Sequence, residues 1–154
     1  MKKILITGCA GIIGFHLTKN FLKIKFKIVG IDSLNNYYSK NLKMKRLSIL
    51  RRFKNFDFKK IDLKNYEKVN SFLNRKEIDI IFHLAAQPGV RVSIMKPFNT
   101  LQQNISTFSN MIEIARIKKV KKFIYASSSS VYGDTKIYPF VENDKENTPV
   151  KPTN

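Results

Sequence analysis

Three glycines follow a short apolar segment near the start of the chain. Residues 4–7 are Ile-Leu-Ile-Thr, and Gly8, Gly11 and Gly14 come after them at intervals of three. This order is typical of a strand, a tight turn and the first turn of a helix. The unpaired N–H groups at the start of such a helix favour phosphate, so the segment is a candidate site for the pyrophosphate of a dinucleotide. A glycine-rich turn without a ligand would contain the same residues, and the rest of the chain has to decide between the two interpretations.

A carboxylate lies at the end of the next predicted strand. Residues 28–32 are Ile-Val-Gly-Ile-Asp, which places Asp32 24 positions after Gly8. A carboxylate at this distance can accept hydrogen bonds from the hydroxyl groups of an adenosine ribose. Its charge would repel the 2′-phosphate of NADP, so NAD is the expected cofactor. The alternative is a carboxylate that only caps a turn.

The order of predicted elements explains why these residues would meet. Apolar runs predict strands at 2–7, 28–32, 56–62, 79–84 and 122–126, and helical spacing predicts helices at 12–24, 42–53, 66–72 and 99–117. Strands that alternate with helices predict an α/β fold with a parallel sheet covered on both faces. Ligands bind outside the carboxyl ends of such strands, where Gly8, Asp32, Asp62, Ala85 and the serines at 127–130 all fall. We therefore favour the dinucleotide site, and we expect loop structure from residue 133 onward.

The composition indicates a soluble globular protein. The 154 residues are 43% hydrophobic and 12% aromatic, which is ordinary for a single domain with its own core. No apolar run approaches the roughly 20 residues that span a bilayer, so no membrane association is expected. The single cysteine, Cys9, excludes an internal disulfide or a cysteine cluster for a metal, and it fits a reducing cytoplasm.

The formal net charge of +18 would suit a surface that binds nucleic acid. The Lys and Arg residues are nevertheless spread along the chain, with no basic tail and no nucleic-acid-binding motif. Solvated, lysine-rich helix faces, including the basic face of the helix at 42–53, are the favoured explanation. Nucleic-acid binding stays as an alternative, and a positive field would also attract an anionic cofactor.

Several short motifs are distributed over the predicted strand ends. They are the glycine motif, Gly30-Ile31-Asp32, Asp62-Leu63, His83-Leu84-Ala85-Ala86-Gln87 and Ser-Ser-Ser-Ser-Val-Tyr-Gly at 127–133. Together they resemble the extended short-chain dehydrogenase/reductase family, in its NAD-dependent sugar-nucleotide epimerase/dehydratase branch. Residues 32–38, Leu42-Lys43, Arg46-Leu47 and 87–91 resemble UDP-glucuronate 4-epimerases in particular. The resemblance implies a Rossmann-like, doubly wound parallel sheet, here truncated at its C-terminal side to about five strands.

The resemblance also implies which residues surround NAD. Gly8, Gly11, Ile13 and Gly14 would hold the pyrophosphate, Asp32 the ribose, Asp62 and Leu63 the adenine, and Leu84, Ala85 and Ala86 would line the cleft. Asn35 is assigned to the cofactor as well. Asn104 would support the cofactor site, and the alternative for it is a polar residue on a helix surface.

A second group of residues lies where the family binds and transforms its nucleotide sugar. Gln87, Arg91 and Ser93 would contact the substrate, although Arg91 could equally be a solvated loop residue. Ser128 corresponds to the catalytic serine, whose hydroxyl would hydrogen-bond the sugar C4 oxygen. A serine-rich turn that bonds its own backbone is expected for Ser129 and Ser130 instead. The implied chemistry is removal of a hydride from sugar C4 by NAD+, rotation of the 4-keto sugar, and return of the hydride to its other face.

The Tyr-x-x-x-Lys pair that supplies the base in this family is expected just beyond residue 154. The one literal match, Tyr132 and Lys136, is interpreted as fortuitous because Gly133 and Asp134 disfavour the helix that would align them. Residues 1–154 are thus expected to form an incomplete NAD-binding domain without the C-terminal substrate domain, inactive alone, with an unpaired last strand. A homodimer or a separately encoded C-terminal half are the candidate partners. The alternatives are a non-catalytic NAD-binding module completed by a second polypeptide, or a portion of a nucleotide-sugar 4,6-dehydratase.

Overall fold

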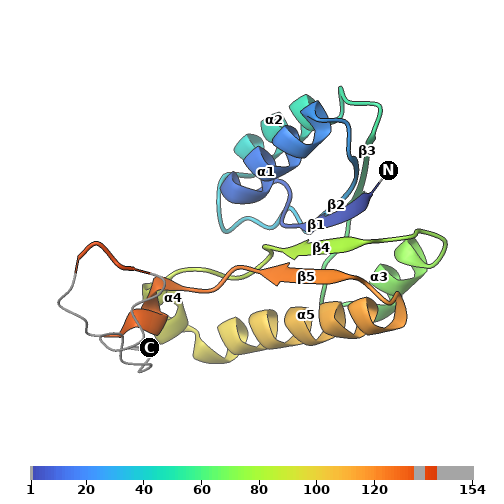
Figure 1. Cartoon of the computed structure of the whole chain (residues 1–154). Helices are drawn as coiled ribbons and strands as arrows, with labels where there is room; N and C mark the ends of the chain where they lie inside the picture. The colour runs from blue at the N-terminus through green and yellow to red at the C-terminus, as the bar shows by residue number, and fades with distance from the viewer. Residues whose placement is uncertain (1, 134–137, 142–154) are drawn as a thin grey trace.

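The computed structural model describes residues 2–133 and 138–141, which form a parallel five-stranded sheet between helices (Figure 1). The strands are β1 (Lys3–Thr7), β2 (Lys27–Asp32), β3 (Phe56–Lys60), β4 (Ile80–His83) and β5 (Lys122–Tyr125). The helices are α1 (Ile12–Lys23), α2 (Lys40–Leu50), α3 (Tyr66–Leu73), α4 (Val90–Met95), α5 (Pro97–Ile117) and the short 3-10 helix η1 (Ser129–Tyr132). The predicted α/β fold with a Rossmann-like parallel sheet is confirmed.

The strand order is β3-β2-β1-β4-β5, and every neighbouring pair is parallel. The chain therefore adds β2 and β3 on one side of β1 and then returns to add β4 and β5 on the other side. The order of the strands reverses between β1 and β4, and in open α/β sheets the ligand-binding crevice lies at such a point, outside the carboxyl ends of the strands.

Both faces of the sheet are covered, as predicted. In Figure 1, α1 and α2 lie on one face, and α3 and α5 lie on the other. Alternate side chains of β1 enter the two cores: Ile4 and Ile6 pack with Leu22 and Leu47, whereas Leu5 packs with residues such as Met111. A fully buried side chain of this size contributes about 1.5–3 kcal/mol, so β1 is held by both cores.

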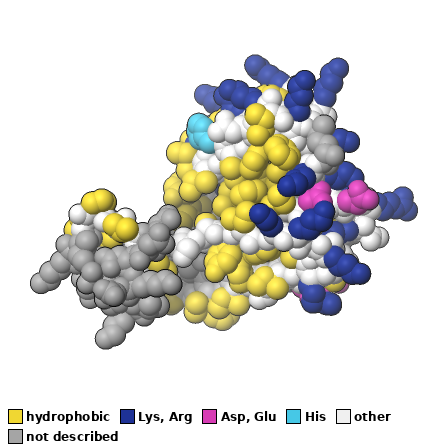
Figure 2. Space-filling view, in the orientation of Figure 1, with side chains coloured by type: hydrophobic (Ala, Val, Ile, Leu, Met, Phe, Trp, Pro, Cys, Tyr) yellow, Lys and Arg dark blue, Asp and Glu magenta, His cyan; other side chains and the backbone are white. Residues whose placement is uncertain are grey.

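The edge strand β5 is much less covered than the inner strands. Lys122, Ile124 and Tyr125 are exposed, although the Tyr125 ring packs on Phe108 with a centroid distance of 5.1 Å. Among the described residues, β5 pairs with β4 alone. In the space-filling view, Lys and Arg side chains lie along the upper and right-hand margin of the visible face and also within it, next to acidic side chains (Figure 2).

Three differences from the predicted helices have local causes. The helix predicted at 42–53 is α2 at Lys40–Leu50, because the Ser39 hydroxyl accepts the Leu42 N–H at 3.4 Å and starts the helix earlier. The helix α4 was not predicted, because Pro88 and Gly89 indicate a turn. The helix predicted from residue 99 begins at Pro97, and proline suits the first turn of a helix.

No helix within residues 2–133 and 138–141 combines the length and the hydropathy that crossing a membrane requires. The same residues contain no cluster of three or more His, Cys, Asp or Glu side chains that could hold a metal ion.

Candidate functional site

A cavity of about 1090 Å³ opens at the carboxyl ends of the strands. It brings together residues that follow each of the five strands. Its lining includes Gly8, Gly11, Ile13, Gly14, Asp32, Asn35, Asp62, Leu63, Leu84, Ala85, Ala86, Gln87, Ser93, Asn104 and Ser128. Arg91 is exposed on α4 and is not among the lining residues, which agrees with the solvated alternative for this side chain.

The glycine loop after β1 has a conformation that side chains would prevent. Gly8 has a φ of 69°, in the left-handed region, and its N–H donates to Ile31 O at 2.8 Å. A Cβ atom at Gly14 would overlap the carbonyl group of Gly8, so only glycine lets α1 approach the loop this closely. Gly11, the N-cap of α1, has no side chain to cap the first N–H groups, and the first turn contains no acidic residue. These N–H groups fit a phosphate group.

Asp32 is built into the glycine loop. Its Oδ2 accepts the Ala10 N–H at 3.0 Å, and its Oδ1 accepts the Leu34 N–H at 2.8 Å. The residue is 6% exposed, and its carboxylate lies 4.0 Å from the ammonium group of Lys43. Each carboxylate oxygen can accept a second hydrogen bond, so Asp32 both fixes the loop and keeps acceptor capacity for a ligand.

The prediction that the basic face of α2 is solvated is wrong for two residues. Lys43 is 7% exposed and donates to Asn35 O at 3.2 Å and to Asn35 Oδ1 at 2.8 Å. Arg46 Nη1 donates to Ala10 O at 3.2 Å. Because α2 starts at Lys40, positions 43, 46, 47 and 50 lie at helical spacing toward the sheet, and a buried ammonium group is tolerated only when it is paired. This spacing is the signal that could have identified both residues.

Thr7 holds the start of the segment that follows β4, a role that the sequence did not reveal. Its Oγ1 accepts the N–H groups of Leu84 at 3.1 Å and Ala85 at 3.2 Å. Both lone pairs of the hydroxyl are then used, so its proton is donated to His83 Nδ1 at 2.9 Å. The His83 imidazole is therefore neutral with its proton on Nε2. Burial lowers the pKa of His83 to about 4, in agreement with a neutral ring.

Two asparagines of α5 hold the loops that follow β4 and β3. Asn104 Oδ1 accepts the Gln87 N–H at 2.7 Å, and its Nδ2 donates to Gln87 O at 3.2 Å. Asn110 Nδ2 donates to Leu63 O at 2.8 Å and to Lys64 O at 3.1 Å. Asn104 is thus more than a polar residue on a helix surface, and its contact is with the loop backbone. Asn110 was not predicted, because a single polar residue in a long helix gives no signal of its own.

The serine-rich segment differs from the prediction in one respect. The Ser128 hydroxyl oxygen accepts the Ser130 N–H at 3.2 Å and caps η1, so the serine that bonds its own backbone is Ser128 rather than Ser129 or Ser130. The reason is that Ser128 is extended and directly precedes the helical turn, which is the position where a hydroxyl can cap it. The hydroxyl proton of Ser128 is not used in this bond and can be donated to a ligand in the cavity.

Tyr132 lies in η1, and its ring stacks on Phe140 with centroids 4.7 Å apart and an interplanar angle of 5°. Lys136 is outside the described residues. The contact with Phe140 gives Tyr132 a packing role.

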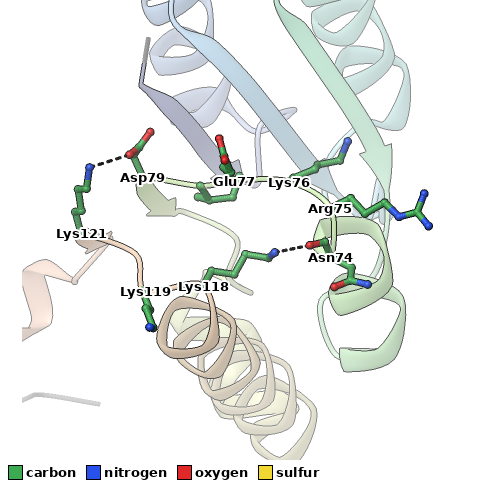
Figure 3. Close-up of a pocket in the computed structure, with 9 residues that line it drawn as sticks. Asn74, Arg75, Lys76, Glu77, Asp79, Lys118, Lys119 and Lys121 are labelled. Atoms are coloured by element: carbon green, nitrogen blue, oxygen red, sulfur yellow. Dashed lines mark hydrogen bonds and ion pairs between the residues drawn. The ribbon is translucent and has the colours of Figure 1, made fainter.

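A second pocket, of about 490 Å³, lies at the opposite end of the sheet, where the chain enters β4 and β5 (Figure 3). Two of its lysines are bonded within the pocket: Lys121 Nζ lies 3.2 Å from Asp79 Oδ1, and Lys118 Nζ donates to the backbone oxygen of Asn74 at 2.9 Å. None of the predicted site residues lines it. The cavity at the carboxyl ends is therefore the candidate functional site.

The strand order, the glycine loop and the acidic residue that ends β2 define the class of this protein as a Rossmann-like α/β domain. The family model described as GDP-mannose 4,6 dehydratase matches residues 5–154, and the chain belongs to this family. The resemblance to sugar-nucleotide epimerases and dehydratases is thereby confirmed.

Individual relatives agree with this assignment. The chain is 44% identical over 151 residues to an uncharacterized protein of Methanocaldococcus jannaschii, covering 97% of this chain and 46% of that protein. It is 36% identical over 148 residues to a UDP-glucuronate 4-epimerase of Thermodesulfobacterium geofontis, covering 96% of this chain and 46% of that protein. The chain spans less than half the length of these relatives.

Solved structures show the same similarity. The UDP-Glc/GlcNAc 4-epimerase of Campylobacter jejuni is 32% identical with a TM-score of 0.84, and the match covers 99% of this chain and 44% of that chain. A UDP-glucuronic acid 4-epimerase variant of Bacillus cereus, solved with UDP-4-deoxy-4-fluoro-glucuronic acid and NAD, is 35% identical with a TM-score of 0.76; the match covers 92% of this chain and 44% of that chain.

Proposed function

We propose that the chain is the NAD-binding part of a nucleotide-sugar 4-epimerase that acts on UDP-glucuronate. The observation that carries the proposal is the cavity at the carboxyl ends of the strands, which is lined by residues that follow all five of them. Two relatives that are 36% identical to this chain over 148 and 146 aligned residues support the choice of substrate, because they are named UDP-glucuronate 4-epimerase and probable UDP-glucuronate 4-epimerase.

The residues that follow the different strands suit different parts of NAD. The glycine loop and the uncapped start of α1 would hold the pyrophosphate. Asp32 would accept hydrogen bonds from the ribose hydroxyls with the acceptor capacity that Ala10 and Leu34 leave. Asn35 would bind the cofactor beside Asp32. The remaining residues assigned to NAD are Asp62 and Leu63 at the adenine, and Leu84, Ala85, Ala86 and Asn104 along the cleft.

The substrate side of the cavity would start at Gln87, which Asn104 holds on both its N–H and its carbonyl group. NAD, when bound, would accept a hydride from sugar C4 and return it to the other face of the ring. The Ser128 hydroxyl would donate a hydrogen bond to the C4 oxygen. Ser93 lines the same cavity, whereas Arg91 would have to move toward it to contact a sugar.

We further propose that these 154 residues alone do not turn over UDP-glucuronate. Oxidation of C4 needs a base that takes the proton of the C4 hydroxyl group. Tyr132 stacks on Phe140, and it is not on an α-helix that would align it with a lysine four residues later. Residues 1–154 would be an incomplete NAD-binding domain. The substrate domain would come from further residues of the same polypeptide or from a separately encoded half, and a homodimer is the other candidate assembly.

The description of the family model makes a nucleotide-sugar 4,6-dehydratase portion the second candidate. The two activities differ in their products, because epimerisation inverts C4 and dehydration gives a 4-keto-6-deoxy sugar. Product analysis after the chain is combined with a polypeptide that supplies the Tyr-x-x-x-Lys pair separates them. Without such a partner, a non-catalytic NAD-binding module is the remaining alternative.

Calorimetric titration of the chain with NAD+ and NADP+ tests the proposed site. We expect NAD+ to bind more tightly than NADP+, and we expect Asp32→Ala and Gly11→Val to abolish measurable binding. Asp57→Ala is the matched control, because Asp57 lies on β3, bonds Lys76 and is outside the cavity. Unchanged affinity in both site variants would show that the assignment is wrong. Turnover of UDP-glucuronate by the chain alone would contradict the interpretation of Tyr132 and Lys136.

A further inference from the structure

Two loops from opposite sides of the cavity meet at Tyr37 and Gly89. Tyr37 lies between β2 and α2, and Gly89 directly precedes α4. A Cβ atom at Gly89 would overlap the Tyr37 hydroxyl, so the hydroxyl lies against the side of Gly89 that has no side chain. Both residues line the cavity. The contact is therefore part of the site and not of the surrounding surface.

The topology places this contact across the crevice. In the strand order, β2 lies on one side of β1 and β4 on the other. The crevice of a doubly wound sheet lies at the carboxyl end of β1, between these two strands. A dinucleotide that extends from Asp32, after β2, to Ala85, after β4, would cross the crevice between these two strand ends. The contact between the two loops spans the same strand ends.

Each loop is held firmly on the side from which it starts. The first is fixed by Leu34 N, which donates to Asp32 Oδ1 at 2.8 Å, and by Lys43 Nζ, which donates to Asn35 Oδ1 at 2.8 Å. The second is fixed by the two hydrogen bonds between Asn104 and Gln87. One residue, Asn36, separates the first anchor from Tyr37, and one residue, Pro88, separates the second from Gly89. A small backbone movement is therefore enough to make or break the contact.

We propose that Tyr37 and Gly89 form a clasp across the cavity that slows the release of the bound dinucleotide. The inference rests on the proposed function. An enzyme that takes a hydride from a sugar and returns it to the same sugar has to keep the reduced cofactor between the two steps. A clasp that opens only for exchange of the whole dinucleotide meets this requirement, because the loops anchored at Asn35 and Gln87 remain in place when it opens.

The release of NADH from the chain tests the clasp. NADH is bound first, excess NAD+ is then added, and the fluorescence of NADH reports its dissociation. We expect Tyr37→Ala to release NADH about tenfold faster, the factor that corresponds to roughly 1.4 kcal/mol. In the proposed arrangement AMP would occupy only the β2 side of the crevice, so its affinity should change by less than about twofold. Tyr125→Ala is the matched control, because this tyrosine is on β5 and does not line the cavity.

A second variant on the opposite loop makes the test independent of any one substitution. Gly89→Ala introduces the Cβ that overlaps the Tyr37 hydroxyl, so it should accelerate NADH release as Tyr37→Ala does, and the double variant should be no faster than either. Equal rates of NADH release from Tyr37→Ala and the unaltered chain would contradict the clasp and leave the proposed function intact. Effects that multiply in the double variant would do the same. Failure of the unaltered chain to bind NADH would overturn both.

Discussion

The Thr7 hydroxyl oxygen lies 2.9 Å from Nδ1 of His83, and this hydrogen bond joins the carboxyl ends of β1 and β4. The same oxygen accepts the N–H groups of Leu84 and Ala85. One side chain of β1 therefore determines how the chain leaves β4. Since Leu84 and Ala85 line the cavity, the shape of the candidate site depends on Thr7 although Thr7 itself is not in the lining.

We expect Thr7→Val to destabilise the fold by about 2 kcal/mol, because two backbone N–H groups lose their acceptor and His83 loses its donor. Thr7→Ser keeps the hydroxyl and should cost less than about 1 kcal/mol. Urea denaturation followed by circular dichroism measures both free energies of unfolding. Equal stability of the valine and serine variants would show that the hydroxyl is not the anchor.

The buried imidazole of His83 predicts a pH dependence of stability. Its pKa is about 4 in the folded chain, below the ordinary value of 6.5, so between these pH values the unfolded chain binds more protons. The stabilisation is fully present above pH 6.5 and is lost as the pH falls to about 4, by at most about 3 kcal/mol. His83→Asn keeps an acceptor for Thr7 but does not titrate. Its free energy of unfolding should therefore fall less steeply than that of the unaltered chain across this range.

The thiol of Cys9 should be unreactive in the folded chain. Burial, and to a smaller extent the negative charge of Asp32, raises the pKa of Cys9 well above its usual range, and only the thiolate reacts with disulfide reagents. We expect 5,5′-dithiobis(2-nitrobenzoic acid) to label Cys9 only after unfolding in urea. Rapid labelling at neutral pH without denaturant would contradict the buried position of this side chain.

Lys43→Met should destabilise the fold by about 2 kcal/mol, because Asn35 loses its donor and the buried carboxylate of Asp32 loses the nearest cation. Lys45→Met is the matched control on the same helix, because Lys45 is exposed, and it should stay within about 0.5 kcal/mol of the unaltered chain. Thermal unfolding of both variants provides the comparison. Similar losses in the two would mean that Lys43 acts only through the general charge of α2.

The order of strands and helices could be predicted for two reasons. Strands buried on both faces of a parallel sheet need continuous apolar runs, and the segments between these runs have apolar residues at helical spacing. The position of each residue relative to a strand end followed from that order, which is why so many predicted residues line one cavity. The helix α4 could not be predicted, because Pro88 and Gly89 break the local pattern. It packs against α5, a contact that the neighbouring residues do not reveal.

The direction in which polar side chains point was the hardest property to predict. Lys43 and Lys45 are two positions apart and chemically identical, and only the register of α2 against the sheet makes one buried and the other exposed. The hydroxyl of Ser128 was likewise placed by the turn of η1, which depends on the backbone and not on the run of identical serines.

The pairing of β1 has a consequence for the order in which the chain folds. Ile4 lies opposite both Ile28 on β2 and Ile80 on β4, so the second pairing has to close a much longer segment of chain. A longer closure costs more conformational entropy and is slower, so we expect the half of the sheet with β2 to form before β4 docks on β1. The crevice then exists only after this late step. A ligand that spans it would bind the finished sheet in preference to the half-formed one, and would act as a selective stabiliser of the last folding event.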